Sequence, residues 1–266
     1  MKKLWFLAIV SLICVFTLLN SSNNAFSAEL DLESATKIIR QFTNNPTLEL
    51  KDVPNAEHAL GVHERTFVTP DGSAIFTLDE VNKIVTTAIV QPDAHARLAT
   101  PLSLDQGQAL AETVVQQQLG STNGLNLHYQ ASKDHAAAGT LQRFEWVETR
   151  GSANAITPNR VMLTIDPATG TVVSYSRIVA RAIDIDPEPK INYQQALEIV
   201  AKQNSFAFVE RSHRLDIWWE HNDRSKNYIL RWVINIEAKN SAKHGITEVA
   251  QYVINAHNGD IIEVLR

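Results

Sequence analysis

One short pattern occurs three times along this chain and limits the folds that the chain can adopt. A run of strand-forming residues ends in Asp or Asn, a short turn follows, and a second strand-forming run begins. The copies span residues 76–85, 163–172 and 252–261, with Asp79, Asp166 and Asn255 as the equivalent polar residues. Their spacing of 87 and 89 residues predicts an array of related supersecondary units.

Each copy has the chemistry of a β-hairpin. An Asp or Asn side chain at the start of a turn accepts a hydrogen bond from the backbone two residues on. Gly170 and Gly259 then supply the positive φ that the chain reversal requires. The first copy has Lys83 in this place, so the sequence predicts either a strained turn or a left-handed Asn82.

A helical pattern precedes each hairpin. Apolar residues recur at spacings of three and four, which gives each helix one stripe to bury. The patterns span residues 35–42, 109–119 and 196–201. The candidate N-caps are Ser103 or Asp105 for the second helix and Asn192 for the third.

A further strand signal lies between each helix and its hairpin, at residues 62–68, 141–147 and 228–234. Each unit is therefore predicted to be a helix followed by three or more antiparallel strands. The helix can cover the apolar face of its sheet. The predicted fold class is α+β, with tandem small units, each a helix packed on an antiparallel sheet. Their predicted boundaries are 29–91, 103–179 and 191–266.

The N-terminal segment has the features of a secretory signal peptide. Lys2 and Lys3 precede an apolar run from Leu4 to Leu19, and small residues follow near Ala28. We expect residues 1–28 to be removed by cleavage after Ala28; cleavage after Ser27 and an uncleaved anchor are the alternatives. The single cysteine lies in this segment, so the rest of the chain forms no disulfide. The predicted location is secreted or in the cell envelope, with membrane attachment only if the segment is retained.

These units resemble the PepSY family, which is named for peptidase propeptides and a spore-germination protein. The third unit carries the resemblance in Arg231-Trp232-Val233 and in residues 252–262. The second carries it in residues 144–147 and 163–170, whereas the first departs from it at Lys83 and has no Trp. The resemblance implies a cystatin-like α+β unit that acts in the bacterial cell envelope or outside the cell.

In propeptides of thermolysin-like metalloproteases, such units act as chaperone and inhibitor of the attached enzyme. We expect no protease within this sequence: His63-Glu64 begins the zinc motif His-Glu-x-x-His, but Phe67 stands at the second ligand position. The resemblance therefore implies a protein that acts in trans and binds and regulates, as inhibitor or chaperone, an extracellular or envelope protease. A secreted metalloprotease is the candidate partner. The alternative is an envelope or spore-associated structural or scaffolding protein that has no effect on proteolysis.

The sequence gives no sign of catalysis. It contains neither a nucleophile motif of the Gly-x-Ser-x-Gly type nor a phosphate-binding loop. The nine histidines lack the close pairing of zinc ligands, and Pro187 and Pro189 make a calcium loop at Asp184, Asp186 and Glu188 a poor fit. We therefore expect no enzyme activity, cofactor or metal. The net charge of −5 also argues against nucleic acid as a partner.

Trp218 and Trp219 are the candidate residues for binding a protein partner. Adjacent side chains of a strand face opposite sides, so one indole should be buried while the other can be exposed. An exposed Trp is a common anchor at protein interfaces. Arg214 and Arg224 lie nearby and would suit an acidic or aromatic partner, although a neighbouring unit could cover the outer Trp instead.

Overall fold

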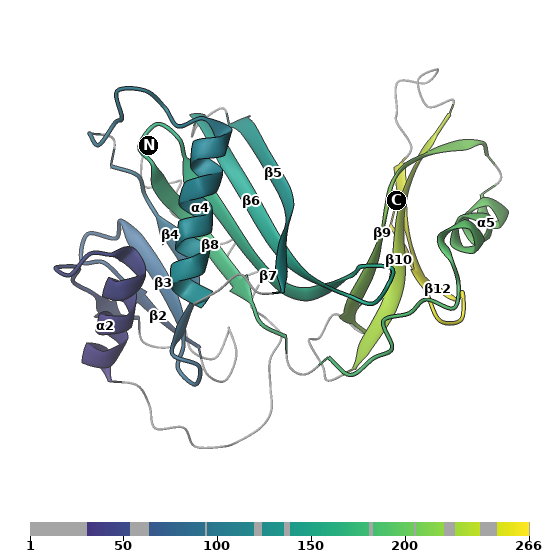
Figure 1. Ribbon diagram of the computed structural model, residues 1–266, viewed down its shortest axis with the longest axis horizontal. Coiled ribbons are helices and arrows are strands. Elements are labelled where there is room, and N and C mark those ends of the chain that lie inside the picture. The colour runs from purple at the N-terminus through teal and green to yellow at the C-terminus, as the bar shows by residue number, and fades with distance from the viewer. Residues whose placement is uncertain are drawn as a thin grey trace. The chain divides into compact units, whose positions relative to one another are not determined.

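The computed structural model describes residues 31–53, 64–93, 95–119, 124–135, 139–180, 183–204, 206–220, 227–239 and 249–265 (Figure 1). The predicted signal peptide, residues 1–28, lies outside these ranges. The described part is a mixed α+β structure in which a helix is followed by four strands, three times in succession. The first set is α2 (Leu32–Thr43), β1 (Lys51–Asp52), β2 (Glu64–Val68), β3 (Ala74–Asp79) and β4 (Ile84–Val90). The second is α4 (Leu104–Leu119), β5 (Leu125–His135), β6 (Gly139–Arg150), β7 (Ala155–Asp166) and β8 (Thr171–Ile178). The third is α5 (Tyr193–Gln203), β9 (Phe208–Trp219), β10 (Tyr228–Ala238), β11 (Val249–Asn255) and β12 (Ile261–Leu265).

The chain forms two compact units. The larger unit contains residues up to 146 together with 160–178, and the smaller contains 147–159 and the residues from 179 onward. The first two predicted units thus share one compact body, because the last strand of the first set pairs with the last strand of the second.

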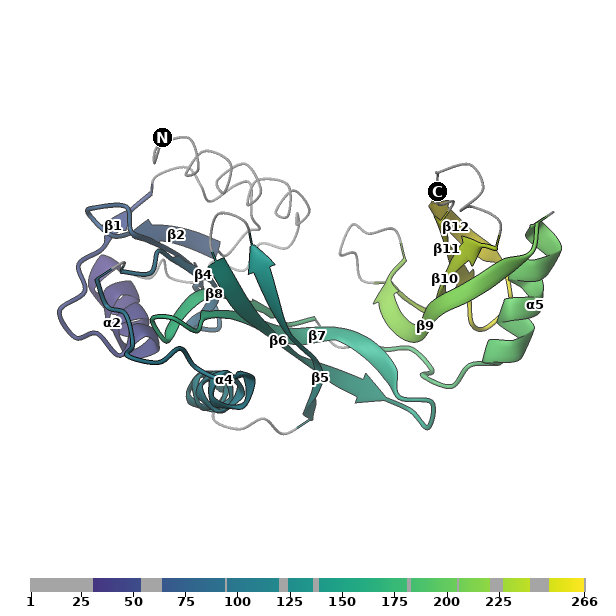
Figure 2. The same cartoon turned by 90° about the horizontal axis from the view of Figure 1, so that it is seen from above.

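The larger unit is an antiparallel sheet with two helices on one face (Figure 2). Its strands follow the order β1-β2-β3-β4-β8-β7-β6-β5. The pairing of β4 with β8 aligns Thr87 with Ser176, Ala88 with Tyr175, and Ile89 with Ser174. This pairing joins the two sets of strands into one sheet.

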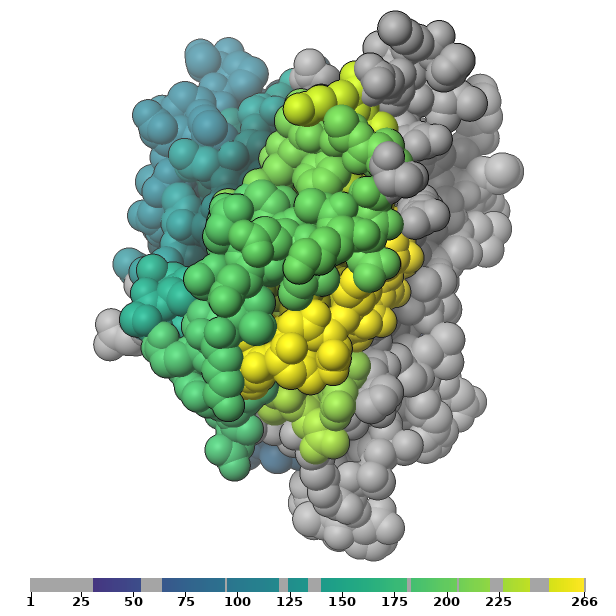
Figure 3. All heavy atoms as spheres, turned by 90° about the vertical axis from the view of Figure 1, so that its right-hand side faces the viewer, coloured from purple at the N-terminus to yellow at the C-terminus, as the bar shows by residue number. Residues whose placement is uncertain are grey.

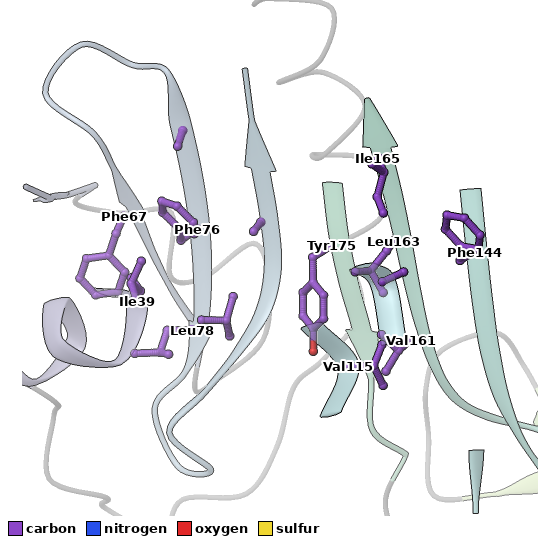
Figure 4. Packing of buried hydrophobic residues seen from close by; sticks show 14 of the residues in the cluster. Ile39, Phe67, Phe76, Leu78, Val115, Phe144, Val161, Leu163, Ile165 and Tyr175 are labelled. Atoms are coloured by element: carbon purple, nitrogen blue, oxygen red, sulfur yellow. The ribbon is translucent and has the colours of Figure 1, made fainter. Parts of the chain in front are cut away.

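One continuous apolar core lies between that sheet and its two helices (Figure 4). Ile39 of α2 lies against Phe67, Phe76 and Leu78, while Val115 of α4 lies near Val161 and Leu163 of β7. The ring of Phe42 contacts that of Tyr175, with 5.0 Å between the centroids, and so links α2 to β8. Burial of each such side chain contributes about 1.5–3 kcal/mol, so the core holds the two helices and the sheet together.

The smaller unit places α5 against one face of the sheet β9-β10-β11-β12. Its core contains Val200 of α5, Ile217 of β9, Ile234 of β10 and Tyr252 of β11. Figure 3 shows the C-terminal strand, coloured yellow, at the surface of this unit beside α5. The turn between β6 and β7 also belongs to this unit, and β7 pairs in parallel with β9 at Ile156.

The three helices begin in the same way. The side chains of Asp31, Ser103 and Asn192 each accept a hydrogen bond from the backbone N–H three residues on. Four residues after each cap stands a buried small residue, namely Ala35, Gly107 and Ala196. A Cβ added at Gly107 would lie 1.8 Å from the Gln142 Oε1 atom, so this position has no room for a side chain. Small residues at this turn let each helix approach its strands.

The last hairpin of each set also shares one irregularity. The register shifts by one residue between Thr77 and Leu78, between Thr164 and Ile165, and between Val253 and Ile254. Each shift follows the first pairs after the turn, so one extra residue stands in β4, β8 and β12 at the same place. This bulge fixes which residues of the three last strands are equivalent.

Candidate functional site

The polar residues at the hairpins serve the turns themselves. The Asp79 Oδ1 atom accepts hydrogen bonds from the backbone N–H groups of Val81 and Asn82, both at 2.9 Å. Asp166 accepts from the backbone of Ala168 at 2.8 Å, and Asn255 accepts from that of His257 at 2.8 Å. In each case the acceptor satisfies the start of a reversal, as expected for such residues.

In each of the three turns, the residue at the equivalent position has the left-handed backbone conformation. Gly170 has a φ of 71° and Gly259 a φ of 83°. In the first hairpin Lys83 itself takes the left-handed conformation, with a φ of 54°, and Asn82 does not. For a residue with a Cβ this conformation costs about 1–2 kcal/mol, so the first turn is strained.

The two candidate tryptophans lie at the end of β9. Trp219 is buried, with 6 % of its surface exposed, whereas Trp218 is half-buried. The two rings meet edge to face with 4.9 Å between their centroids, so they touch although only Trp219 is buried. The strand ends at Trp219, where side chains can reach around the edge of the sheet.

Trp218 belongs to a charged cluster on the face of the smaller sheet opposite α5. Leu215 and Ile217 point into the core, so Arg214, Asp216 and Trp218 take the other face. The Arg214 Nε atom donates to the buried carboxylate of Asp216 at 2.9 Å. Arg231, directly opposite Asp216 on β10, lies 3.9 Å from the same oxygen and 5.2 Å from the centre of the Trp218 ring.

The side chains of Arg214 and Arg231 thus both lie beside the carboxylate of Asp216. The side chain of Arg214 is 46 % exposed, so it can reach an acidic or aromatic group of a partner. The Trp218 ring is already covered in part by Arg231, which reduces the area that a partner can bury on it. Arg224 lies outside the described residues.

The acidic and histidine residues considered as ligands have structural contacts. Glu188 accepts hydrogen bonds from the hydroxyl and the backbone N–H of Ser152, at 2.6 Å and 2.7 Å, which hold the pKa of Glu188 below its usual value. His213 stacks on Tyr193 of α5 and contacts Glu210 through its Nδ1 atom at 2.7 Å. Within the described ranges, no group of three His, Cys, Asp or Glu residues could hold a metal ion.

Glu148 is the centre of a polar network in the turn region between β6 and β7. Burial raises its pKa, but hydrogen bonds from Asn159, Arg150 and Thr157 outweigh this effect, so the pKa lies below the usual value. Arg150 also donates to the carbonyl of Ile183 at 3.1 Å, and Asn159 accepts from the backbone of Ala180. These hydrogen bonds hold Ala180 and Ile183, in the segment that leads to α5, against the turn region, so the network has a structural role.

Two sheet edges are the sites that the sequence interpretation did not identify. Among the described residues β5 pairs with β6 alone, and β12 pairs with β11 alone. Along β5 the side chains alternate from residue 125 to 132, partly buried at the odd positions and exposed at the even ones. Leu125 and Leu127 pack on the core under α4, whereas Asn126 and His128 point away from it. The alternation of residues 125–130 in the sequence is the signal that could have located this strand.

A strand with an open edge offers a row of backbone donors and acceptors to another chain. The described part of β5 contains no proline, so every residue of the strand keeps its backbone donor. None of the described helices is long and apolar enough to span a membrane.

The fold is similar to that of known structures. The C-terminal domain of YpeB from Bacillus megaterium matches with a TM-score of 0.53 and 18 % identity, over 90 % of this chain and 98 % of that domain. An uncharacterized protein from Eubacterium rectale matches with a TM-score of 0.43 and 7 % identity over 88 % of this chain and 83 % of its own, which is too distant to support an argument. No family model matches the sequence, and no curated protein matches it with significance. The YpeB domain contains PepSY units, so the resemblance to the PepSY family that the sequence predicts is confirmed at the level of the fold.

Proposed function

We propose that this chain is an exported, non-catalytic PepSY-type protein that binds and regulates an extracellular or envelope protease. Its structure would consist of three tandem units, each a helix with four strands. The YpeB-like fold and the signal-like N-terminus support the class and the location. The repeated order of helix and strands, the shared capping and the shared bulge support the tandem units.

The open edge of β5 is the observation that carries protein binding. Residues 125–133 span about 30 Å at the usual rise of a strand, enough for a peptide of similar length to pair alongside. Each main-chain hydrogen bond formed in this way contributes about 1 kcal/mol net. Strand addition of this kind gives affinity through the backbone and selectivity through alternate side chains.

The side chains beside the edge define the segment that would fit it. Residues of the added strand on the α4 side would lie next to Leu125, Leu127 and Tyr129, so apolar residues suit these positions. Residues on the opposite side would lie next to His128 and Gln130, so polar residues suit these. We therefore expect the partner to offer an extended segment that alternates between apolar and polar side chains.

The direct test is a titration of the full chain into a secreted thermolysin-like metalloprotease from the same source. Peptide hydrolysis is followed while gel electrophoresis checks that the added chain stays intact. Saturable inhibition by intact chain is expected. Digestion of the chain without inhibition, or no effect at all, would contradict the proposal.

Two neighbouring proline variants, Gln130→Pro and Ala131→Pro, show whether β5 is the site. Consecutive N–H groups of a strand point to opposite edges, so one variant removes a bond to β6 and the other removes an outward donor. The variant that keeps the melting temperature should inhibit on the order of tenfold more weakly, and the parent chain is its control. Equal inhibition by the parent and by this variant would exclude the β5 edge.

A structural role in the envelope or the spore is the second candidate. The edge of β12 favours it, because exposed apolar residues gather there: Ile262, Val264 and Leu265 are 41 %, 38 % and 49 % exposed. A scaffolding protein would associate through such a surface without any effect on proteolysis. The titration separates the two functions, since only the regulator alters peptide hydrolysis.

A further inference from the structure

The last strands of the three sets can be aligned residue by residue. After the turn, Val85 pairs with Leu78, Val172 with Ile165, and Ile261 with Ile254. Each of these partners lies just after the register shift in its own strand. The bulged residue comes next in each strand. Ala88, Tyr175 and Val264 lie three residues after Val85, Val172 and Ile261, respectively, and are therefore equivalent.

The pairing of β4 with β8 is symmetric when it is described in these equivalent positions. Its central pair is Ala88 with Tyr175, which are equivalent residues. On either side, the residue before the centre in one strand aligns with the residue after it in the other, as Thr87 does with Ser176. An approximate twofold axis therefore passes through the central pair, perpendicular to the sheet. This axis also explains why α2 and α4 cover the same face of the sheet (Figure 2).

The third strand of this kind has no such partner among the described residues. Ala88 and Tyr175 are 2 % and 1 % exposed, whereas Val264 is 38 % exposed. Val264 pairs with Tyr252 on its inner side, so it lies on the face that α5 covers, as Ala88 and Tyr175 lie on the face that α2 and α4 cover. The equivalent edge is thus closed in both β4 and β8 of the larger unit, whereas in β12 of the smaller unit it has no strand partner within the described ranges.

We propose that β12 is the interface between two copies of this chain. The two strands would pair antiparallel about a true twofold axis, with Val264 facing Val264 of the second copy. Glu263 would then face Leu265 of the second copy, as Thr87 faces Ser176 in the larger unit. A twofold contact is self-complementary, so one strand edge supplies both sides of the interface.

The side chains at the edge agree with this occupant. Val264 and Leu265 would lose exposed apolar surface in the paired form, which favours association. The two Glu263 side chains would lie diagonally across the axis on the face away from α5, where like charges weaken the contact. A dimer that can dissociate is therefore expected. This inference does not depend on the protease, because it concerns only strands of this chain.

Cysteine crosslinking tests the predicted axis directly. Cys14 is the only cysteine in the sequence, so Val264→Cys in a Cys14→Ser background of the full chain has a single thiol. Facing residues of antiparallel strands have Cα atoms about 4.5–5.5 Å apart, which is within the range for a disulfide. Mild oxidation should give a covalent dimer. The matched control is Val81→Cys in the same background, because Val81 is 50 % exposed in the turn between β3 and β4.

Two further variants test the energetics by sedimentation. Val264→Lys places two ammonium groups on the axis and should raise the dimer dissociation constant on the order of tenfold or more. Glu263→Thr removes the diagonal repulsion and restores the residue type of Thr87, so it should lower that constant. Equal crosslinking of the two cysteine variants, or association of Val264→Lys that matches the parent chain, would overturn the proposal.

Discussion

The outer edges of β4 and β8 can be compared with the outer edge of β12, because the three strands share one position after the same bulge. In the larger unit the first two edges close on each other, and Ala88 and Tyr175 are buried. In the smaller unit the edge remains open among the described residues, and Val264 is exposed. The difference teaches that backbone geometry alone does not decide the role of an edge. The role of an edge depends on which strand lies beside it. A charged residue such as Glu263 disfavours non-specific pairing of an open edge with other strands.

The largest effect is expected from one substitution made at the two equivalent positions. Ala88→Lys forces an ammonium group into a closed edge and should lower the free energy of unfolding by about 3 kcal/mol or more. Val264→Lys leaves its charge in water, so in dilute protein the free energy of unfolding should change by about 0.5 kcal/mol at most. Urea unfolding at low protein concentration measures the free energy of unfolding of both variants.

The comparison of these two variants would fail in either of two ways. If Ala88→Lys were as stable as the parent chain, the edge between β4 and β8 would not be closed. If Val264→Lys were strongly destabilised in dilute protein, β12 would already be covered within one molecule. The parent chain at the same concentration is the control for both.

The glycines of the second and third hairpins should give an intermediate effect. Gly259→Val should cost about 2 kcal/mol, because a β-branched residue resists a φ of 83° and its Cβ would lie 3.2 Å from the Ile199 Cδ1 atom. Gly170→Val should cost somewhat less, because the nearest atom to its Cβ is Leu98 Cδ1, at 3.6 Å. Thermal unfolding gives the order of the two losses. The control is Asn at each position, since Asn tolerates the left-handed region, and unchanged melting of both valine variants would refute the hairpin assignment.

The smallest effect is expected at the first hairpin and has the opposite sign. Lys83→Gly relieves the left-handed strain, but glycine gains entropy in the unfolded chain, so the net stabilisation should be about 0.5–1 kcal/mol. Asn82→Gly is the matched control and should destabilise, because Asn82 is not left-handed and donates to Asp79 at 2.7 Å. Chemical unfolding that ranked these two variants in the reverse order would assign the strain to Asn82.

Local patterns in the sequence are sufficient for much of the fold but not for its long-range pairings. The three hairpins and the three helices follow from turn residues and apolar spacing. In the first turn, the sequence limits the left-handed residue to Lys83 or Asn82. It could not choose Lys83 over Asn82, because both lie in the same turn and the choice depends on how the turn closes. The pairing of β4 with β8 joins residues 87 and 176, and no local pattern records such a contact.

The candidate binding surfaces were less predictable than the fold. Alternation along β9 predicts one buried and one more exposed indole, as Trp219 and Trp218 are, but it does not predict that their rings meet edge to face. The apolar run in β12 is typical of a buried strand, yet Ile262, Val264 and Leu265 are exposed. Exposure of an edge depends on which strands lie beside it, so it follows from topology rather than from composition.

Hydrogen exchange as a function of protein concentration tests the central comparison most directly. The amides of Thr87, Ala88 and Ile89, in the closed edge, should be protected to the same degree at every concentration. Outward amides of residues 263–265 should exchange rapidly in dilute protein and gain protection as the concentration rises. Protection of β12 that does not change with concentration would contradict pairing between two copies of this edge.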